Sequence, residues 1–168
     1  MIKKARSFST AYFAIMFGIC LVMGYIEAVL PLGIGISGAK LGITNFVVLL
    51  LLKRDGFPVA CLINLARILI INMLFGNAIG LAYSLLGGIT STVLMYFLLK
   101  IPSLSSLGVS AAGGAMHNLA QTLCAAVFLG TPSVLKLLPL LLPVGMVAGI
   151  FCGFLAELIL RRLSKANL

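Results

Sequence analysis

The few side chains in this sequence that can carry charge or exchange protons lie inside or beside long apolar runs. Arg67, with Asn64 three residues before it, interrupts the run from residue 57 to residue 75. His117 and Gln121 are four residues apart, so they share one face if the segment is helical. Charged and strongly polar groups in such runs are costly and commonly form ligand sites or ion pathways. We therefore place a candidate binding site at these residues.

Four more polar residues extend this candidate site. Glu27 lies near the end of the first apolar run, Lys40 and Asn45 flank the start of the second, and Asn118 follows His117. The complete set of predicted substrate-binding residues is Glu27, Lys40, Asn45, Arg67, His117, Asn118 and Gln121. With several basic groups and one acid, this set favours an anionic ligand. A second interpretation stays open, in which Arg67 pairs with Glu27 and the amide side chains only join helices.

Motifs for catalysis are missing from the sequence. Gly33, Gly35 and Gly38 match a dinucleotide-binding pattern by spacing alone, since no strand-helix-strand unit surrounds them. A single histidine and a single aspartate, Asp55, provide neither a catalytic triad nor a set of metal ligands. We therefore predict no catalytic residue, no metal ion and no cofactor, and a protein that is not itself an enzyme.

The composition indicates which solvent surrounds these residues. The chain has 168 residues, of which 62% are hydrophobic and 9% are charged, and this is too apolar for a water-soluble domain. The net charge of +9 arises because only three residues are acidic, and no long basic stripe is present to follow nucleic acid. The sequence thus predicts an integral membrane protein surrounded by membrane lipid, without a nucleic-acid partner.

Proline, glycine and charged residues divide the chain into six candidate membrane spans within one all-α domain. A span needs roughly 20 mostly apolar residues. The predicted spans are residues 9–30, 41–52, 57–75, 79–99, 105–129 and 134–163. The second is short, and the sixth contains Pro139 and Pro143, so we expect a separate short helix before the last span.

The basic residues between these spans predict the orientation, because cytoplasmic loops are enriched in Lys and Arg. Placing both termini in the cytoplasm leaves only Lys40 and Lys136 outside. The basic residues then on the cytoplasmic side are Lys3, Lys4, Arg6, Lys53, Arg54, Lys100, Arg161, Arg162 and Lys165. In this topology most of the candidate site lies in the outer half of the membrane, so we expect a pocket that opens outward.

Rows of small residues predict close helix contacts. Gly145, Gly149 and Gly153 follow one another at four-residue spacing, which lets two helices approach closely. Ala14 and Gly18 form a similar pair in the first span. Such rows usually pack within one bundle, but a row can also face a partner subunit, and the Ala14 and Gly18 pair is our candidate for that role.

Three ordered stretches resemble a known family over essentially the whole chain. They are PLGIGISGAKLGITN from Pro31 to Asn45, LARILIINMLFGN from Leu65 to Asn77, and GGAMHNLAQ from Gly113 to Gln121. These stretches resemble the bacterial Gx transporter family, whose members are often labelled heptaprenyl diphosphate synthase component I. That family is similar to the substrate-binding S components of energy-coupling factor (ECF) transporters.

The resemblance implies a six-helix subunit in the bacterial cell membrane that captures a small molecule, such as a vitamin or micronutrient, from outside. Its implied partners are a transmembrane scaffold subunit and two ATPase subunits. Ala14 with Gly18 stands in the place of the docking pattern of S components, in which alanine is the usual residue at both positions. The older label implies an alternative, a membrane accessory of a polyprenyl diphosphate synthase. Such synthases hold magnesium with paired Asp-rich motifs, so a chain with one aspartate would be non-catalytic there.

Overall fold

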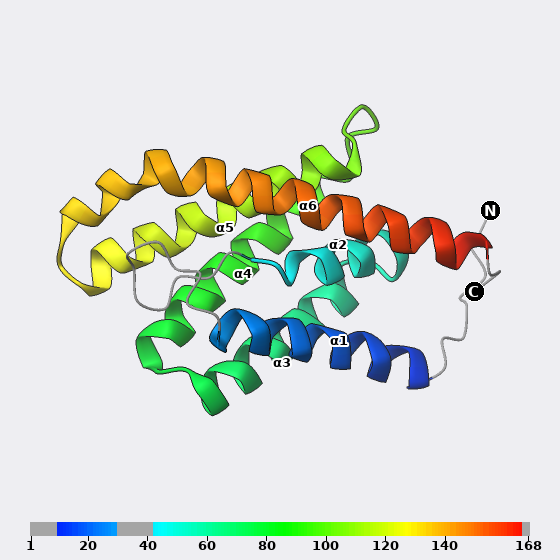
Figure 1. The fold of residues 1–168 in the computed structure, drawn as a ribbon, viewed down its shortest axis with the longest axis horizontal. Coiled ribbons are helices and arrows are strands. Elements are labelled where there is room, and N and C mark those ends of the chain that lie inside the picture. Colours follow the sequence, from blue (N-terminus) through cyan, green and yellow to red (C-terminus); the bar gives the residue numbers. More distant parts are fainter. Residues whose placement is uncertain (1–9, 30–41, 166–168) are drawn as a thin grey trace.

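The computed structural model describes residues 10–29 and 42–165, which form a bundle of helices (Figure 1). Its elements are α1 (Thr10–Val29), α2 (Asn45–Arg54), α3 (Phe57–Phe75), α4 (Ala78–Leu98), α5 (Ser106–Phe128), the 3-10 helix η1 (Pro132–Leu137) and α6 (Leu138–Lys165). These described residues contain no strand, and the prediction of an all-α membrane bundle is confirmed.

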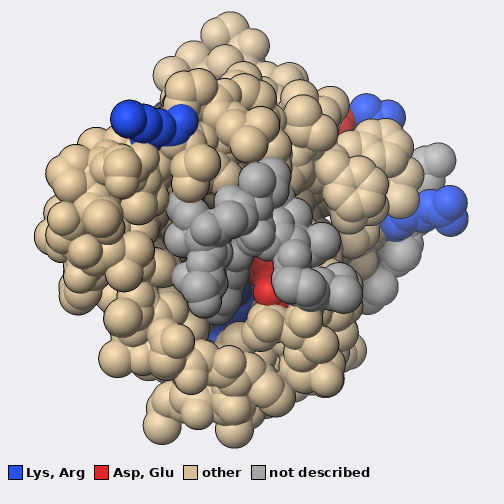
Figure 2. Space-filling view, turned by 60° about the vertical axis from the view of Figure 1, so that its left-hand side comes forward, with Lys and Arg blue, Asp and Glu red and all other residues tan. Residues whose placement is uncertain are grey.

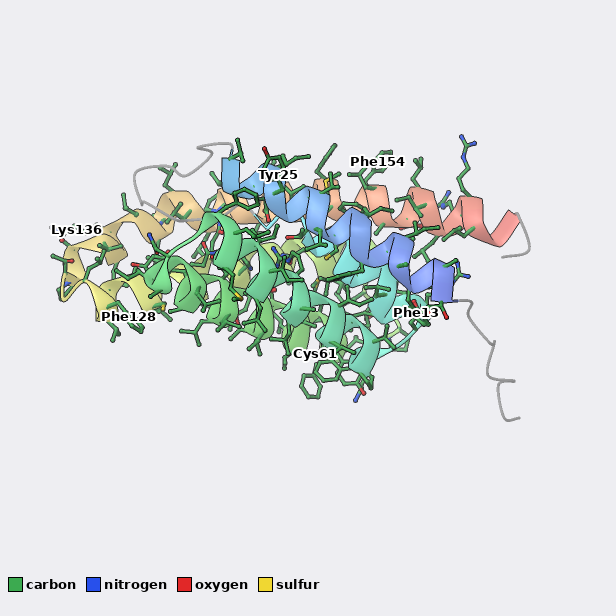
Figure 3. All side chains as sticks on the ribbon, turned by 90° about the horizontal axis from the view of Figure 1, so that it is seen from below. Phe13, Tyr25, Cys61, Phe128, Lys136 and Phe154 are labelled. Atoms are coloured by element: carbon green, nitrogen blue, oxygen red, sulfur yellow. The ribbon has the colours of Figure 1, made fainter. Side chains whose placement is uncertain are left out.

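Four helical segments are long and apolar enough to cross a membrane. They are α1, α3, α4 and the continuous segment from Pro132 to Leu163 that joins η1 to α6. Apolar side chains project outward from the bundle, as Phe128 of α5 (Ser106–Phe128) and Phe154 of α6 do in Figure 3. Met73 is 81% exposed and Val127 is 78% exposed, which in water would leave a large apolar surface uncovered. The chain is therefore a membrane protein.

The short helix α2 lies inside the bundle. Its ten residues rise only about 15 Å, half the thickness of the hydrocarbon core. Every residue from Asn45 to Leu52 is buried, and Figure 1 shows α2 between α6 and α1. A helix that is apolar on all sides is typically buried on all sides, and α2 follows this rule because protein surrounds it from Asn45 to Leu52.

The closest helix contact joins α5 to α6 through glycines. A Cβ atom added to Gly114 would lie 2.0 Å from the Gly145 carbonyl oxygen, and one added to Gly149 would lie 2.3 Å from that of Ser110. A Cβ atom at Gly153 would lie 2.9 Å from Leu107 Cα. The predicted glycine row of the last span therefore packs within this chain, backbone against backbone.

A separate short helix precedes α6, and Pro139 and Pro143 do not lie in it. A 3-10 helix from Pro132 to Leu137 comes first, and Pro139 and Pro143 lie within the continuous helix α6. Pro139 is in the first turn, where a missing N–H removes no helical hydrogen bond. In Figure 1 the start of α1 and the end of α6 lie at one end of the bundle, and η1 lies at the other.

Candidate functional site

Glu27 fastens the last turns of α1 to the turn that precedes α2. The residue is 6% exposed. One carboxylate oxygen, Oε1, accepts a hydrogen bond from the backbone N–H of Ile43, and Oε2 accepts one from Thr44 Oγ1 at 2.8 Å. Glu27 thus supplies acceptors to backbone and side-chain donors just before the first turn of α2, where helical N–H groups have no partner within the helix.

Arg67 reaches Glu27 from the middle of α3. The residue is 3% exposed, and its Nη1 atom lies 3.7 Å from Glu27 Oε2. Its Nη2 atom donates a hydrogen bond to Asn64 Oδ1 at 2.8 Å. The absence of a side chain at Gly24 makes room for this arginine, because a Cβ atom there would lie 2.9 Å from Arg67 Cδ. The two opposite charges are therefore within ion-pair range but not joined by a short hydrogen bond.

Asn64 extends this network to α4. Its Nδ2 atom donates to Thr92 Oγ1 at 3.0 Å and approaches the Gly88 carbonyl oxygen at 3.3 Å. Because Asn64 also accepts from Arg67, its amide group uses both donor and acceptor. We call Glu27, Thr44, Asn64, Arg67 and Thr92 the charged cluster, and it joins α1, α3, α4 and the turn before α2.

His117 and Gln121 form a second polar group on α5. They are 3% and 4% exposed, and His117 Nε2 lies 2.9 Å from Gln121 Nε2. Two glycines leave room for the imidazole ring. A Cβ atom on Gly87 of α4 would lie 3.0 Å from His117 Cε1, and one on Gly42 would lie 3.4 Å from His117 Cδ2. The histidine ring thus lies between α4 and the start of the described segment at Gly42.

Asn45 lies at the turn that reaches both groups, whereas Asn118 contacts another helix. Asn45, 1% exposed, follows the turn bound by Glu27, and a Cβ atom on Gly42 would lie 2.9 Å from Asn45 Nδ2 and 3.4 Å from the His117 ring. Asn118 instead donates to the Leu141 carbonyl oxygen of α6 at 2.7 Å. The turn from residue 42 to 45 is therefore the place where both polar groups meet.

Two buried donors at this place have no hydrogen-bond partner among the residues that the structure describes. They are Asn45 Nδ2 and Arg67 Nε. A buried donor without a partner costs about 1–3 kcal/mol. In Figure 2 acidic and basic atoms appear recessed in the centre of one face, while other charged side chains lie at its edge. The arrangement can bind a group that offers acceptor oxygens.

Of the predicted site residues, Glu27, Asn45 and His117 lie at the turn of residues 42–45. Arg67 lies beside Glu27, and Gln121 lies beside His117. Lys40 lies outside the described residues. Thr44 and Thr92 are not among the residues predicted from the sequence, although Thr92 belongs to a run of small residues in α4. Only their contacts with Glu27 and Asn64 distinguish them from helix-packing threonines.

Two further predictions concern a partner surface and metal binding. Ala14 is exposed, and a Cβ atom added to Gly18 would meet no atom within 4 Å, so this part of α1 is open. Across residues 10–29 and 42–165, no three His, Cys, Asp or Glu side chains lie close enough to hold a metal ion.

Comparison with known proteins gives one match. Searches of curated proteins and of solved structures find no significant similarity. Residues 16–159 match the family described as heptaprenyl diphosphate synthase component I, and this range contains the charged cluster, His117 and Gln121. The family name indicates a component of a synthase. Because the match extends from α1 to near the end of α6, the chain belongs to the heptaprenyl diphosphate synthase component I family.

Proposed function

We propose that this chain is the substrate-binding membrane subunit of an ECF-type uptake transporter, and that the turn at residues 42–45 contacts the captured molecule. The observation that supports this most strongly is the pair of buried donors, Asn45 Nδ2 and Arg67 Nε, without partners in the described part of the chain. Buried donors that lack partners suit a ligand better than they suit helix packing, which would pair them.

The cluster also suggests the kind of ligand. An acceptor oxygen of a carboxylate or carbonyl group would satisfy Arg67 Nε and Asn45 Nδ2. Glu27 offsets the charge of Arg67 at 3.7 Å, so the pull on an anion is weaker than an isolated buried arginine would exert. The ligand of this proposal is therefore a small molecule with acceptor oxygens and a largely apolar body. Such a ligand suits small-molecule sites, which are mostly apolar and contain a few polar groups.

Orientation and partners complete the proposal. Both termini lie in the cytoplasm of a bacterial cell, and the site opens toward the outside in the outer half of the cell membrane. Ala14 and Gly18 contact the scaffold subunit, which is joined to two ATPase subunits. The open surface at Gly18 supports this, because a partner helix can approach a glycine that no residue of this chain covers.

A second function is favoured by the family description. As a component of a heptaprenyl diphosphate synthase, the chain would hold or deliver an isoprenoid substrate to a catalytic subunit. The sequence contains one aspartate, and paired Asp-rich motifs are needed to bind the magnesium of the diphosphate. In this alternative the chain is a membrane accessory and the chemistry belongs to its partner.

Coexpression followed by native mass spectrometry separates the two functions. The chain is produced together with the scaffold and ATPase subunits and with the prenyl synthase subunit of the same source, then purified in mild detergent. A four-subunit assembly that retains a small molecule supports the transporter. An assembly with the synthase subunit alone contradicts it and supports the accessory role.

Matched variants make the docking part testable. Gly18→Leu adds a side chain where the surface is open, and we expect it to prevent scaffold binding while the small molecule is retained. Val147→Leu, at a position 68% exposed on α6, is the control and keeps both. Normal assembly of the Gly18→Leu protein would contradict the assigned docking surface.

A further inference from the structure

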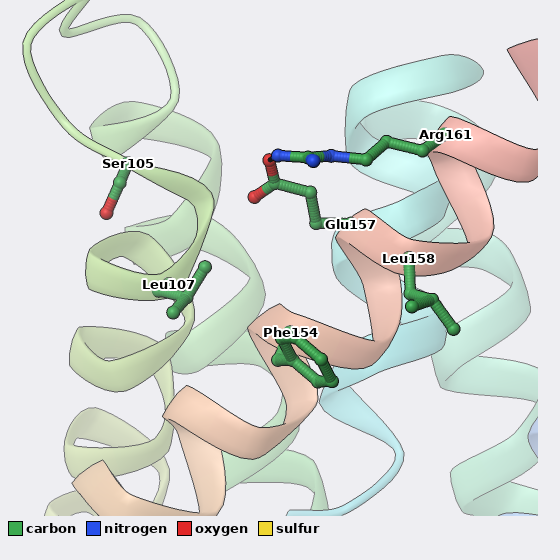
Figure 4. A pocket seen from close by; sticks show the side chains of 6 residues that line it. All are labelled: Ser105, Leu107, Phe154, Glu157, Leu158 and Arg161. Carbon is green, nitrogen blue, oxygen red and sulfur yellow. Dashed lines mark hydrogen bonds and ion pairs between the residues drawn. The ribbon is translucent and has the colours of Figure 1, made fainter.

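A half-open groove lies between α5 and α6, away from the charged cluster. It is lined by Ser105, Leu107, Phe154, Glu157, Leu158 and Arg161, and its volume is about 400 Å³. Ser105 and Leu107 come from the start of α5, and the other four residues are spaced along one face of α6 near its end (Figure 4). We call it the α5–α6 groove.

The groove changes from apolar to charged along the helix axis. Phe154 and Leu158, 54% and 46% exposed, provide apolar surface that faces the surroundings of the bundle. One turn further along α6, Arg161 Nη2 donates to Glu157 Oε1 at 2.9 Å. Figure 4 shows both side chains extending from α6 toward Ser105. An amphiphile could therefore place its polar group beside Arg161 and its hydrocarbon along Phe154.

The charged end carries more positive than negative charge. Lys53, at the end of α2, donates from Nζ to Ser106 Oγ at 2.6 Å, so its charge lies beside the Ser105 and Leu107 end of the groove. Glu157 pairs with Arg161, and the Arg161 side chain is still 77% exposed. An anionic group can approach Arg161 from outside without displacing Glu157.

We propose that the α5–α6 groove binds an anionic phospholipid of the surrounding membrane. The phosphate lies beside Arg161 near the Ser105 end of α5, and the first part of an acyl chain lies along Leu107, Phe154 and Leu158. A groove of about 400 Å³ holds a headgroup and the beginning of a chain, while the rest of the lipid stays in the bilayer. The position favours a lipid, because four helical segments of the chain are long and apolar enough to cross a membrane. The exposed Arg161 favours an anionic headgroup.

The absence of tryptophan from the chain permits a direct test. The Phe154→Trp variant carries a single fluorescent reporter in the groove, and the Phe151→Trp variant carries one at a position 58% exposed on the same helix but outside the groove. Each full-length protein is placed in phosphatidylcholine nanodiscs that contain equal fractions of brominated phosphatidylglycerol or brominated phosphatidylcholine. Bromine quenches tryptophan only at contact, so quenching reports which lipid occupies the site.

We expect brominated phosphatidylglycerol to bind beside the Phe154→Trp reporter about fivefold more strongly than brominated phosphatidylcholine, the effect of one basic group near an anionic lipid. Adding Arg161→Ala removes this preference. Arg162→Ala, which deletes the same charge from the neighbouring residue outside the groove, leaves it intact. The Phe151→Trp reporter shows no preference between the two lipids.

Three results would overturn the proposal. Equal quenching by both lipids at the Phe154→Trp reporter would show that the groove does not select anionic lipid. An equal preference at both reporters, or an equal loss with Arg162→Ala, would show only a general attraction to the basic end. Protection of the Phe154→Trp reporter from both lipids would show that another protein chain covers the groove.

Discussion

Two helix contacts in this bundle depend on glycine but meet different neighbours. Gly149 of α6 faces the backbone of α5, with a Cβ position 2.3 Å from the Ser110 oxygen and 2.8 Å from Ala111 Cα. Gly24 of α1 faces side chains of α3, with a Cβ position 2.9 Å from Arg67 Cδ and 3.0 Å from Ile71 Cγ1. A helical backbone cannot move aside, whereas an arginine side chain can change rotamer. The α5–α6 contact is therefore a fixed scaffold, and the α1–α3 contact is an adjustable wall of the site.

The same substitution at both glycines tests this difference and has the largest expected effect. We expect Gly149→Ala to lower the free energy of unfolding by about 3 kcal/mol and Gly24→Ala to lower it by about 1 kcal/mol. Cys20, Cys124 and Cys152 are buried free thiols, so a thiol-reactive fluorescent dye follows thermal unfolding in detergent. Gly18→Ala, where no atom lies within 4 Å, is the control and does not lower the unfolding temperature. Equal losses at Gly149 and Gly24 would contradict the distinction between the two contacts.

Removing the charge of Arg67 tests the α1–α3 contact, which we describe as adjustable. Arg67→Met leaves the Glu27 carboxylate with its hydrogen bonds from Ile43 and Thr44 but without a counter-charge, and we expect a loss of about 2 kcal/mol in unfolding free energy. Thermal unfolding by the thiol dye measures it. Combining Arg67→Met with Glu27→Gln should recover about half of this loss, because the uncompensated charge is gone.

Ligand capture gives a second readout for Arg67. We expect Arg67→Lys to fold and to retain less of the captured small molecule, as measured by native mass spectrometry. Lysine lacks the Nε donor and the planar fork of arginine. Arg67→Ala abolishes retention. Full retention by a folded Arg67→Ala protein would mean that the arginine only pairs with Glu27.

A smaller effect is expected where α3 meets α4. Thr92→Val removes the acceptor at 3.0 Å from Asn64 Nδ2, and hydrogen bonds between membrane helices are worth about 0.6 kcal/mol. Thr90→Val is the matched control, since Thr90 Oγ1 donates to carbonyl oxygens of its own helix. The difference between the two unfolding temperatures measures the Asn64 contact, and a larger loss at Thr90 would contradict it.

The smallest expected effect concerns Asp55, in the turn between α2 and α3. This turn contacts Tyr12 near the start of α1. Burial raises the pKa of Asp55 above its usual value of 3.8, although Asp55 Oδ2 accepts a hydrogen bond from Tyr12 Oη at 2.9 Å. A raised pKa means that the folded state favours the protonated acid. This contribution to stability is present below pH 3.8 and is lost as the pH rises through the raised pKa.

Asp55→Asn keeps an acceptor for Tyr12 but removes the titration. We therefore expect the unfolding temperature of the variant, followed by circular dichroism, to gain on that of the unmodified protein as the pH rises from 4 toward neutrality. A constant difference between the two proteins across this range would show that Asp55 titrates alike in the folded and unfolded states.

Particular residues show how far prediction from the sequence extends. Arg67 and His117 could be identified as buried polar residues because each interrupts an apolar run, and the structure leaves both 3% exposed. Asn118 follows His117 and looked equivalent to it, yet it bonds to the Leu141 carbonyl oxygen of α6. Adjacent helical residues point about 100° apart, so which of them faces the site depends on how α5 is rotated against α6.

The membrane environment, the all-α fold and the family were determined by the sequence itself, because composition and apolar run length reflect the solvent that surrounds each helix. Only the tertiary structure decided that α2 is enclosed on all sides, that the glycine row of α6 packs on α5, and that Glu27 lies 3.7 Å from Arg67. Residues 27 and 67 are far apart along the chain. Their approach depends on the packing of α1 against α3, which no local pattern encodes.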